Sequence, residues 1–122
     1  MSTRANVIIK NKNEKLYFYR HSDGYPEGTL PTLNKFMELV KAGVIRDNVS
    51  QSAGWLIILG AIEYKTISND LLDIDIYDYE PKDWKVGAYE PTTGLHGDIE
   101  YLYIIDLDKK EVRLARDDEW KL

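Results

Sequence analysis

Two stretches rich in β-branched and aromatic residues, one near each end of the chain, constrain the fold more than any other feature of the sequence. The first covers residues 6–20 and is interrupted by the polar turn 11–14. The second covers residues 99–116 and is interrupted by the polar turn 108–110. Extended segments of this composition joined by a short polar turn are typical of β-hairpins. The sequence therefore predicts a hairpin near each end of the chain.

Apolar residues at helical spacing follow the first hairpin: Leu33, Phe36, Met37 and Val40. This spacing places them on one face of an amphipathic helix. Pro31 suits the first turn of such a helix, and Gly43 suits its C-terminal end. Glycine and proline in residues 21–28 indicate an irregular loop before it. We predict a short helix that begins near Pro31 and stops before Gly43.

A second helix is predicted from Ser50 or Ser52 to Tyr64. Apolar residues lie nearly all round this segment, which is typical of a buried helix, and either serine suits the N-terminal cap. Gly54 and Gly60 lower the helical propensity, although glycine also lets another element approach closely. The segment is therefore expected to lie inside the molecule.

The order hairpin, helix, helix, hairpin predicts an α+β fold. We expect an antiparallel sheet built from the N- and C-terminal hairpins and packed on one face by two helices, because a sheet with one apolar face must bury it. A chain of 122 residues has the size of one domain, so residues 1–122 are predicted to form a single α+β domain. Strand order does not follow from the sequence.

The composition excludes several classes of protein. The chain has no cysteine, so disulfides, thiolate metal sites and cysteine nucleophiles are excluded. Its formal net charge of −5 argues against direct nucleic-acid binding, which depends on clustered Lys and Arg. No signal peptide or membrane-spanning stretch is apparent. We expect a cytoplasmic protein with no membrane association and no cofactor.

An acidic segment with interspersed tyrosines covers residues 70–83. The alternation Asp73-Ile74-Asp75-Ile76 is typical of a strand with one charged face. A solvated edge strand or an irregular flap explains it simply. A row of carboxylates also resembles a phosphate backbone, which keeps mimicry of nucleic acid open as an alternative function.

The densest group of polar side chains lies in residues 20–28. Arg20 and His21 are suited to hold an anion, while Asp23 could orient the imidazole for acid or base chemistry. Turn chemistry explains the same residues without a ligand, because Asp23 suits a turn and the proline after Tyr25 fixes its exit. We treat Arg20, His21, Asp23 and Tyr25 as candidate binding residues on a rigid, water-facing corner.

A second histidine repeats this spacing, since His96 and Asp98 echo His21 and Asp23. Two such loops, brought together, could offer imidazoles and carboxylates to a divalent metal. Hydrogen bonds across the loops are the simpler interpretation. We therefore list His96 and Asp98 as binding candidates and predict no metal ligand.

Standard catalytic motifs are missing from the sequence. It has no Gly-x-Ser-x-Gly elbow, P-loop or dinucleotide fingerprint. Tyr17 and Tyr19 share one strand face, and Tyr101 and Tyr103 share another, so a sheet could present paired phenols to a partner. Half-buried sheet residues are an equally good account of these tyrosines. No catalytic residue is assigned.

The start Ser2-Thr3-Arg4 and the loop His-Ser-Asp-Gly-Tyr-Pro at 21–26 resemble small uncharacterised proteins of bacteriophages and prophages. The match covers roughly the first third of the chain. The resemblance implies an accessory protein of a mobile element that acts inside a bacterial cell. It also draws attention to Arg4, which could pair with Asp23, or could form an anion site with Arg20 and His21.

We therefore predict a non-enzymatic accessory protein that binds a cellular protein, with proteins of defence systems as one class of partner. One alternative is a small hydrolase or a nucleotide- or phosphate-binding protein that uses the two His-x-Asp loops. The loops would have to converge for that alternative to hold. The other alternative is the acidic nucleic-acid mimic, and the oligomeric state is left open.

Overall fold

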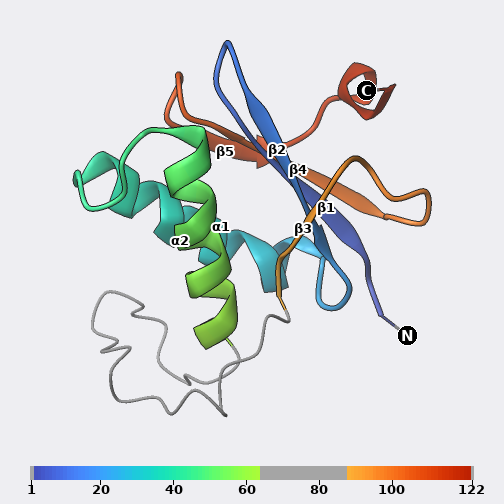
Figure 1. Cartoon of the computed structure of the whole chain (residues 1–122). Coiled ribbons are helices and arrows are strands. Elements are labelled where there is room, and N and C mark those ends of the chain that lie inside the picture. The colour runs from blue at the N-terminus through green and yellow to red at the C-terminus, as the bar shows by residue number, and fades with distance from the viewer. Residues whose placement is uncertain (1, 64–87, 122) are drawn as a thin grey trace.

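The computed structural model describes residues 2–63 and 88–121 (Figure 1). Five strands, two α-helices and a short 3-10 helix make up these residues, in the following order: β1 (Ala5–Lys10), β2 (Lys15–Arg20), α1 (Pro26–Lys41), α2 (Val49–Glu63), β3 (Glu90–Thr92), β4 (Tyr101–Asp106), β5 (Glu111–Leu114) and η4 (Asp117–Lys121). Both predicted hairpins are therefore confirmed. The acidic segment 70–83 lies outside the described residues.

The strands form one sheet with the order β3-β2-β1-β4-β5. The two hairpins, β1 with β2 and β4 with β5, are antiparallel. They meet in the middle of the sheet, where β1 and β4 run parallel from Ala5 opposite Tyr101 to Lys10 opposite Asp106. The predicted α+β fold is confirmed, with the refinement that the sheet is mixed. The parallel pair arises because the chain returns across the sheet after β3 before it enters β4.

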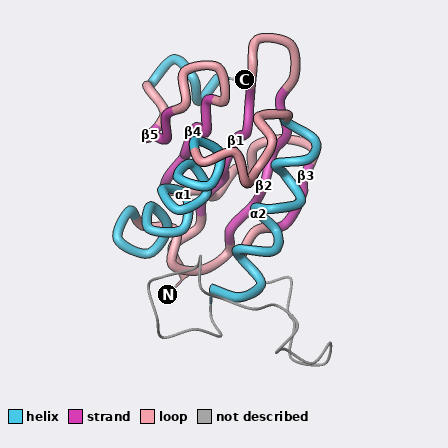
Figure 2. Tube along the Cα trace, turned by 90° about the vertical axis from the view of Figure 1, so that its left-hand side faces the viewer, coloured by secondary structure: helices cyan, strands magenta, loops and turns pink. Residues whose placement is uncertain are grey.

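Both helices cover the same face of the sheet, as predicted (Figure 2). This helix-covered face carries the larger apolar core, with Val7, Ile9 and Phe18 from the strands packed against Leu33 and Leu56 from the helices. All five side chains are buried. Burial of apolar surface contributes about 25 cal/mol for each Å², so this layer stabilises the fold.

The opposite face of the sheet, called here the open face, has a smaller apolar cluster. Ile8, Leu102 and Ile104 are buried there. They are covered by Leu95 and Ile99 from the connection between β3 and β4, together with other partly buried side chains. The open face is therefore covered by irregular chain rather than by a helix, and this places loop side chains directly on the sheet.

Helix α1 begins at Pro26, five residues before the predicted start at Pro31. Proline is well tolerated at the first helical position, because the N–H that it lacks would have no partner there. The prediction of an irregular loop up to residue 28 was therefore wrong at its end. Pro31 lies inside the helix and is exposed.

The end of α1 is as predicted. Gly43 has φ 80°, in the left-handed region that favours glycine. Its N–H donates to the Val40 carbonyl at 3.1 Å, and the Val44 N–H donates to the Leu39 carbonyl at 3.0 Å. This pair of hydrogen bonds is the Schellman motif, which satisfies carbonyls that the helix leaves without partners.

Helix α2 confirms the second predicted helix, but its cap differs from the prediction. The Gln51 N–H donates to the Asn48 side-chain oxygen at 3.1 Å, so Asn48 caps the helix in place of Ser50 or Ser52. Ser52 is buried and its hydroxyl donates to the Val49 carbonyl. The predicted end at Tyr64 lies outside the described residues.

Gly60 of α2 has the role that its sequence position suggested. A Cβ atom at this position would lie 2.6 Å from Cδ2 of Tyr89 and 3.0 Å from Cβ of Ala88. Only glycine allows the chain that enters β3 to pack this closely on the helix.

Among the residues that the structure describes, neither helix has the length and apolar character needed to span a membrane.

Candidate functional site

Arg20, the first candidate residue, points into the molecule. Its side chain is 1% exposed, and it donates from Nη1 and Nη2 to the Glu63 carboxylate at 2.8 and 2.9 Å. Its Nε donates to the Ser22 carbonyl at 2.7 Å, and the guanidinium lies 5.1 Å from the centre of the Tyr89 ring. Arg20 therefore ties the end of β2 to α2 and does not share a surface with His21.

The rest of the corner between β2 and α1 is held by backbone contacts. The Gly24 N–H donates to the Thr3 carbonyl at 2.9 Å, and the Tyr103 hydroxyl donates to the Gly24 carbonyl at 2.6 Å. A Cβ atom at Gly24 would lie 2.8 Å from Cβ of Ala5. The corner expected from the sequence is therefore packed on β1 and β4, and it is buried at Gly24 rather than water-facing throughout.

Asp23 serves the turn rather than the imidazole beside it. Its φ is 58°, a left-handed conformation that aspartate adopts more readily than most residues. Its carbonyl accepts from the Thr29 hydroxyl at 2.9 Å, and its carboxylate accepts from the Tyr25 hydroxyl at 3.3 Å. Tyr25 itself is 38% exposed. Among the described residues, no hydrogen bond joins Asp23 to His21, so Asp23 does not orient the imidazole as predicted.

His21 and His96 nevertheless converge, because both contact the phenol of Tyr19 at the end of β2. The Tyr19 hydroxyl and Nδ1 of His21 share a hydrogen bond of 3.0 Å. The His96 ring stacks on the Tyr19 ring with centroids 3.8 Å apart and planes 8° from parallel. The two histidine loops therefore meet at the Tyr19 side chain.

The loop that carries His96 is held in register by Asn6 of β1. The Asn6 side chain is buried, donates from Nδ2 to the Phe18 carbonyl at 2.8 Å and accepts the His96 N–H at 2.8 Å. Nε2 of His96 also lies 3.3 Å from the Thr92 hydroxyl. One buried amide thus fixes the loop on the strand next to Tyr19.

Arg4 and Asp98 complete this group of side chains. Nη1 of Arg4 lies 3.2 Å from Oδ2 of Asp98, and the two side chains are 39% and 55% exposed. Arg4 therefore pairs with Asp98 and not with Asp23. Burial raises the pKa of the Tyr19 hydroxyl and the Asp98 charge raises it further, while Arg4 opposes the shift. The phenol consequently stays neutral at physiological pH.

We call Arg4, Tyr19, His21, His96 and Asp98 the imidazole–phenol cluster. The sequence identified four of its members and missed Tyr19 as the centre. The sequence contained part of the information needed to find Tyr19, because strand alternation puts it on the face opposite to Phe18 and Arg20. What the sequence could not provide is the path of the chain after β3, which brings His96 across the sheet.

The chemistry available to the cluster is hydrogen bonding and stacking. Neither imidazole has a hydrogen-bonded carboxylate among the contacts of the described residues, so the arrangement that tunes histidine for proton transfer is not formed there. Within residues 2–63 and 88–121, no three His, Asp or Glu side chains come together as metal ligands would.

Of the other tyrosines expected at a surface, Tyr17 and Tyr101 are half-buried and Tyr103 is buried. Tyr103 is fully buried on the helix-covered face, and burial raises the pKa of its hydroxyl to about 12. Its ring stacks with that of Tyr101 at a centroid distance of 6.3 Å. Tyr103 belongs to the core and the half-buried Tyr101 packs against it, so β4 does not present a pair of exposed phenols.

A shallow hollow of about 320 Å³ lies elsewhere, between α1 and β5. Met37 and Val112 contribute apolar surface, and Lys41 and Glu111 are among the charged residues that line it. None of its lining residues belongs to the imidazole–phenol cluster.

Comparison of the chain with protein-family models, curated proteins and solved structures found no match.

Proposed function

We propose that this chain is a non-enzymatic binding protein that engages a cellular protein through the imidazole–phenol cluster. The observation that carries the proposal is the convergence of His21 and His96 on the phenol of Tyr19. Both histidines are exposed although their rings are anchored. Polar groups that are fixed in place yet open to solvent are suited to recognition.

The rigidity of the cluster favours binding. The His96 loop is fixed by the buried amide of Asn6, and the corner that carries His21 is fixed at Gly24. Side chains that are already ordered lose little conformational entropy when a partner docks, so more of the contact energy appears as affinity. The cluster is built for a partner of defined shape.

The balance of charge in the cluster indicates the partner's chemistry. Arg4 and Asp98 neutralise each other, and the phenol is neutral. A surface of imidazole edges and a compensated ion pair around the Tyr19 ring resembles the polar and aromatic composition of transient protein interfaces. A protein surface with hydrogen-bonding side chains fits it better than a nucleic acid, which would require uncompensated cations.

The resemblance of residues 2–4 and 21–26 to small proteins of bacteriophages and prophages supports a narrower form of this proposal. An accessory protein of a mobile element would meet its partner in the cytoplasm of the bacterial host. Proteins of host defence systems are one class of partner that such an accessory protein would engage.

The test is affinity capture from bacterial lysate with the wild-type chain and with a His21→Ala/His96→Ala double variant. We expect a stoichiometric partner with the wild type and its loss with the double variant. Glu14→Lys, an exposed change at the turn between β1 and β2, is the control and should retain the partner. Absence of a stoichiometric partner, or equal capture by the double variant, would contradict the proposal.

A second candidate function is favoured by the same convergence. His21, His96 and Arg4 surround one phenol, so a phosphate or carboxylate could displace Asp98 from Arg4 and bind there. Titration with inorganic phosphate, followed by NMR of the imidazole protons, tests this. Saturable shifts that disappear in Arg4→Ala would support anion binding, and shifts no larger than those caused by chloride would exclude it.

A further inference from the structure

The two edges of the sheet differ in how well they are protected against pairing with another strand. At one edge, β3 is only three residues long and contains Pro91, which has no N–H to donate. At the other edge, β5 has no proline and no further strand of the described residues beside it. An unpaired edge of this kind is a template for another strand.

The hydrogen-bonding pattern of β5 identifies which backbone groups point outwards. The Ala115 N–H donates to the Leu102 carbonyl at 2.8 Å, so these residues form a hydrogen-bonded pair with β4. Such pairs alternate along an antiparallel ladder, which makes Arg113 with Ile104 the next one. Val112 and Leu114 therefore direct their N–H and carbonyl groups away from β4, towards the free edge.

We propose that β5 pairs antiparallel with β5 of a second copy of this chain, with Val112 opposite Val112, and that the two sheets become one continuous sheet. In this register the two Val112 residues exchange both backbone hydrogen bonds, because their polar groups already point outwards. The inference uses none of the residues of the imidazole–phenol cluster, so it stands independently of the proposed function.

Charge selects this register. Glu111 and Arg113 share one face of β5 and already form an ion pair, with Nε of Arg113 3.3 Å from Oε1 of Glu111. With Val112 on the two-fold axis, Glu111 of each copy lies opposite Arg113 of the other. The four charges then form a rectangle in which every neighbour has the opposite sign, which stabilises cross-strand pairs.

Two neighbouring registers also let the outward backbone groups of the two β5 strands face each other, but both registers are unfavourable. A shift in one direction places Arg113 opposite Arg113, and a shift in the other places Glu111 opposite Glu111. Like charges directly opposite each other destabilise a strand pair. The sequence Glu-Val-Arg is thus complementary to itself in one antiparallel register.

Apolar side chains on the other face of β5 add to the contact. Leu114 is 45% exposed and Val112 is partly buried. In the proposed register Leu114 of one copy lies diagonal to Val112 of the other, within reach of side-chain contact. The contact is small, so we expect a weak dimer with a Kd on the order of 100 µM.

Sedimentation velocity over a range of concentrations up to about 1 mM tests the proposal, since a weak dimer is populated there. Glu111→Lys places lysine opposite Arg113, and Arg113→Glu places glutamate opposite Glu111. We expect each variant alone to dimerise at least about tenfold more weakly than the wild type. A mixture of the two variants restores opposite charges, so it should form a heterodimer of near wild-type affinity.

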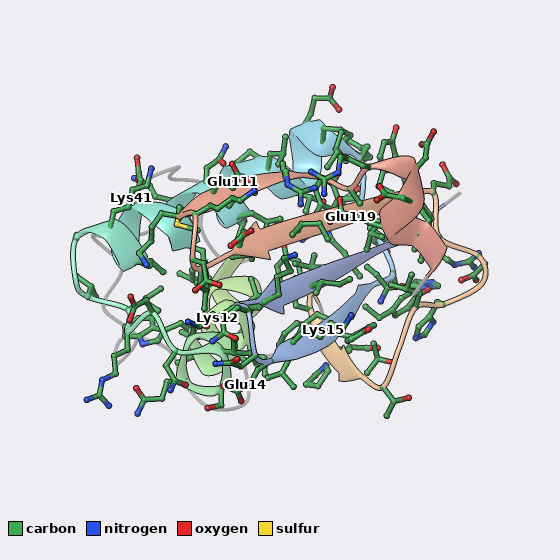
Figure 3. The ribbon with its side chains drawn as sticks, turned by 90° about the horizontal axis from the view of Figure 1, so that it is seen from above. Lys12, Glu14, Lys15, Lys41, Glu111 and Glu119 are labelled. Carbon is green, nitrogen blue, oxygen red and sulfur yellow. The ribbon has the colours of Figure 1, made fainter. Side chains whose placement is uncertain are left out.

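A backbone variant makes the test independent of Arg113, which also contacts Glu119. Val112→Pro removes an outward N–H that β4 does not use, so it should abolish dimerisation while circular dichroism shows a folded chain. Glu14→Lys makes the same charge change as Glu111→Lys at the β1–β2 turn, well separated from β5, and should not alter dimerisation (Figure 3). A wild-type chain that stays monomeric at the highest concentration, or Val112→Pro that dimerises normally, would overturn the proposal.

Discussion

Tyr19 and Arg20 are neighbours at the end of β2, yet they lie on opposite faces of the sheet and have opposite roles. Arg20 points to the helix-covered face, is 1% exposed and binds the Glu63 carboxylate through two hydrogen bonds. Tyr19 points to the open face, where His21 and His96 contact its ring and hydroxyl and remain exposed. A strand sends successive side chains to opposite faces, and this alternation separates the two.

What covers a side chain therefore decides its role more than its chemical type does. A guanidinium under α2 has no access to a ligand and must be neutralised within the molecule, because an unpaired buried charge is costly. In the part of the chain that the structure describes, the imidazoles of His21 and His96 remain exposed. The helix-covered face therefore holds the fold together, and the open face at this end offers groups to a partner.

Removal of Arg20 is expected to have the largest effect on stability. Arg20→Ala leaves the Glu63 carboxylate without its bidentate partner, so we expect the free energy of unfolding to fall by about 3–5 kcal/mol. Urea denaturation followed by circular dichroism measures it. Replacing both members, as in Arg20→Met/Glu63→Leu, should recover part of the loss because no charge is then left unpaired.

Arg4 provides the matched control, since it is an arginine in an ion pair on the open face. Arg4→Ala should cost no more than about 1 kcal/mol, because both Arg4 and Asp98 are substantially exposed and water replaces the interaction. Equal losses for Arg4→Ala and Arg20→Ala would show that the two faces do not differ as described.

The ion pair between Arg113 and Glu119 predicts a loss of stability in acid. Hydrogen bonds from Arg113 lower the pKa of Glu119 from 4.5 to about 2. The charged form is favoured by folding, so the stabilisation is complete above about pH 4.5 and is lost as pH falls towards 2. It amounts to about 3 kcal/mol, because each tenfold change in proton affinity between the folded and unfolded chain corresponds to about 1.4 kcal/mol.

Unfolding measured between pH 6 and 2 tests this linkage. Glu119→Gln cannot titrate, so the difference in stability between wild type and variant should shrink as the pH falls through this range. A difference that does not change with pH would show that Glu119 stabilises the chain by packing alone.

Two tyrosines extend the comparison to neutral groups. Tyr103→Phe leaves the Gly24 carbonyl buried without its donor, which should cost about 2 kcal/mol. Tyr19→Phe removes a hydroxyl that meets the exposed imidazole of His21, so it should cost about 1 kcal/mol or less. Thermal unfolding of the two variants gives the ranking, and a larger loss for Tyr19→Phe would reverse the assignment of roles.

A small effect on stability, similar to that of Tyr19→Phe, is expected for His96→Ala. The variant loses the stack on Tyr19 but keeps the backbone N–H that donates to Asn6, so the cost should be about 1 kcal/mol. A loss of more than about 3 kcal/mol, of the size seen for core truncations, would mean that the ring is part of the core and not a contact surface. Urea denaturation alongside Tyr19→Phe provides the measurement.

Much of the fold was determined by the sequence alone. Alternating and β-branched residues specify both hairpins, the spacing of Leu33, Phe36 and Val40 specifies α1, and Gly43 specifies where that helix ends. These features are local, because they depend on the periods of strand and helix and on backbone conformations that glycine favours. The sequence did not predict the start of α1 at Pro26 or the cap at Asn48, because several nearby residues suit each position.

Which candidate residues meet depends on long-range packing. The pairing of β1 with β4, the path of the chain over the open face and the position of α2 above Arg20 all join segments far apart in the sequence. Contacts of this kind follow from how whole layers bury their apolar faces, which no local pattern encodes. For this reason the sequence named His21 and His96 as candidates, while packing placed Tyr19 between them and buried Arg20 in the core.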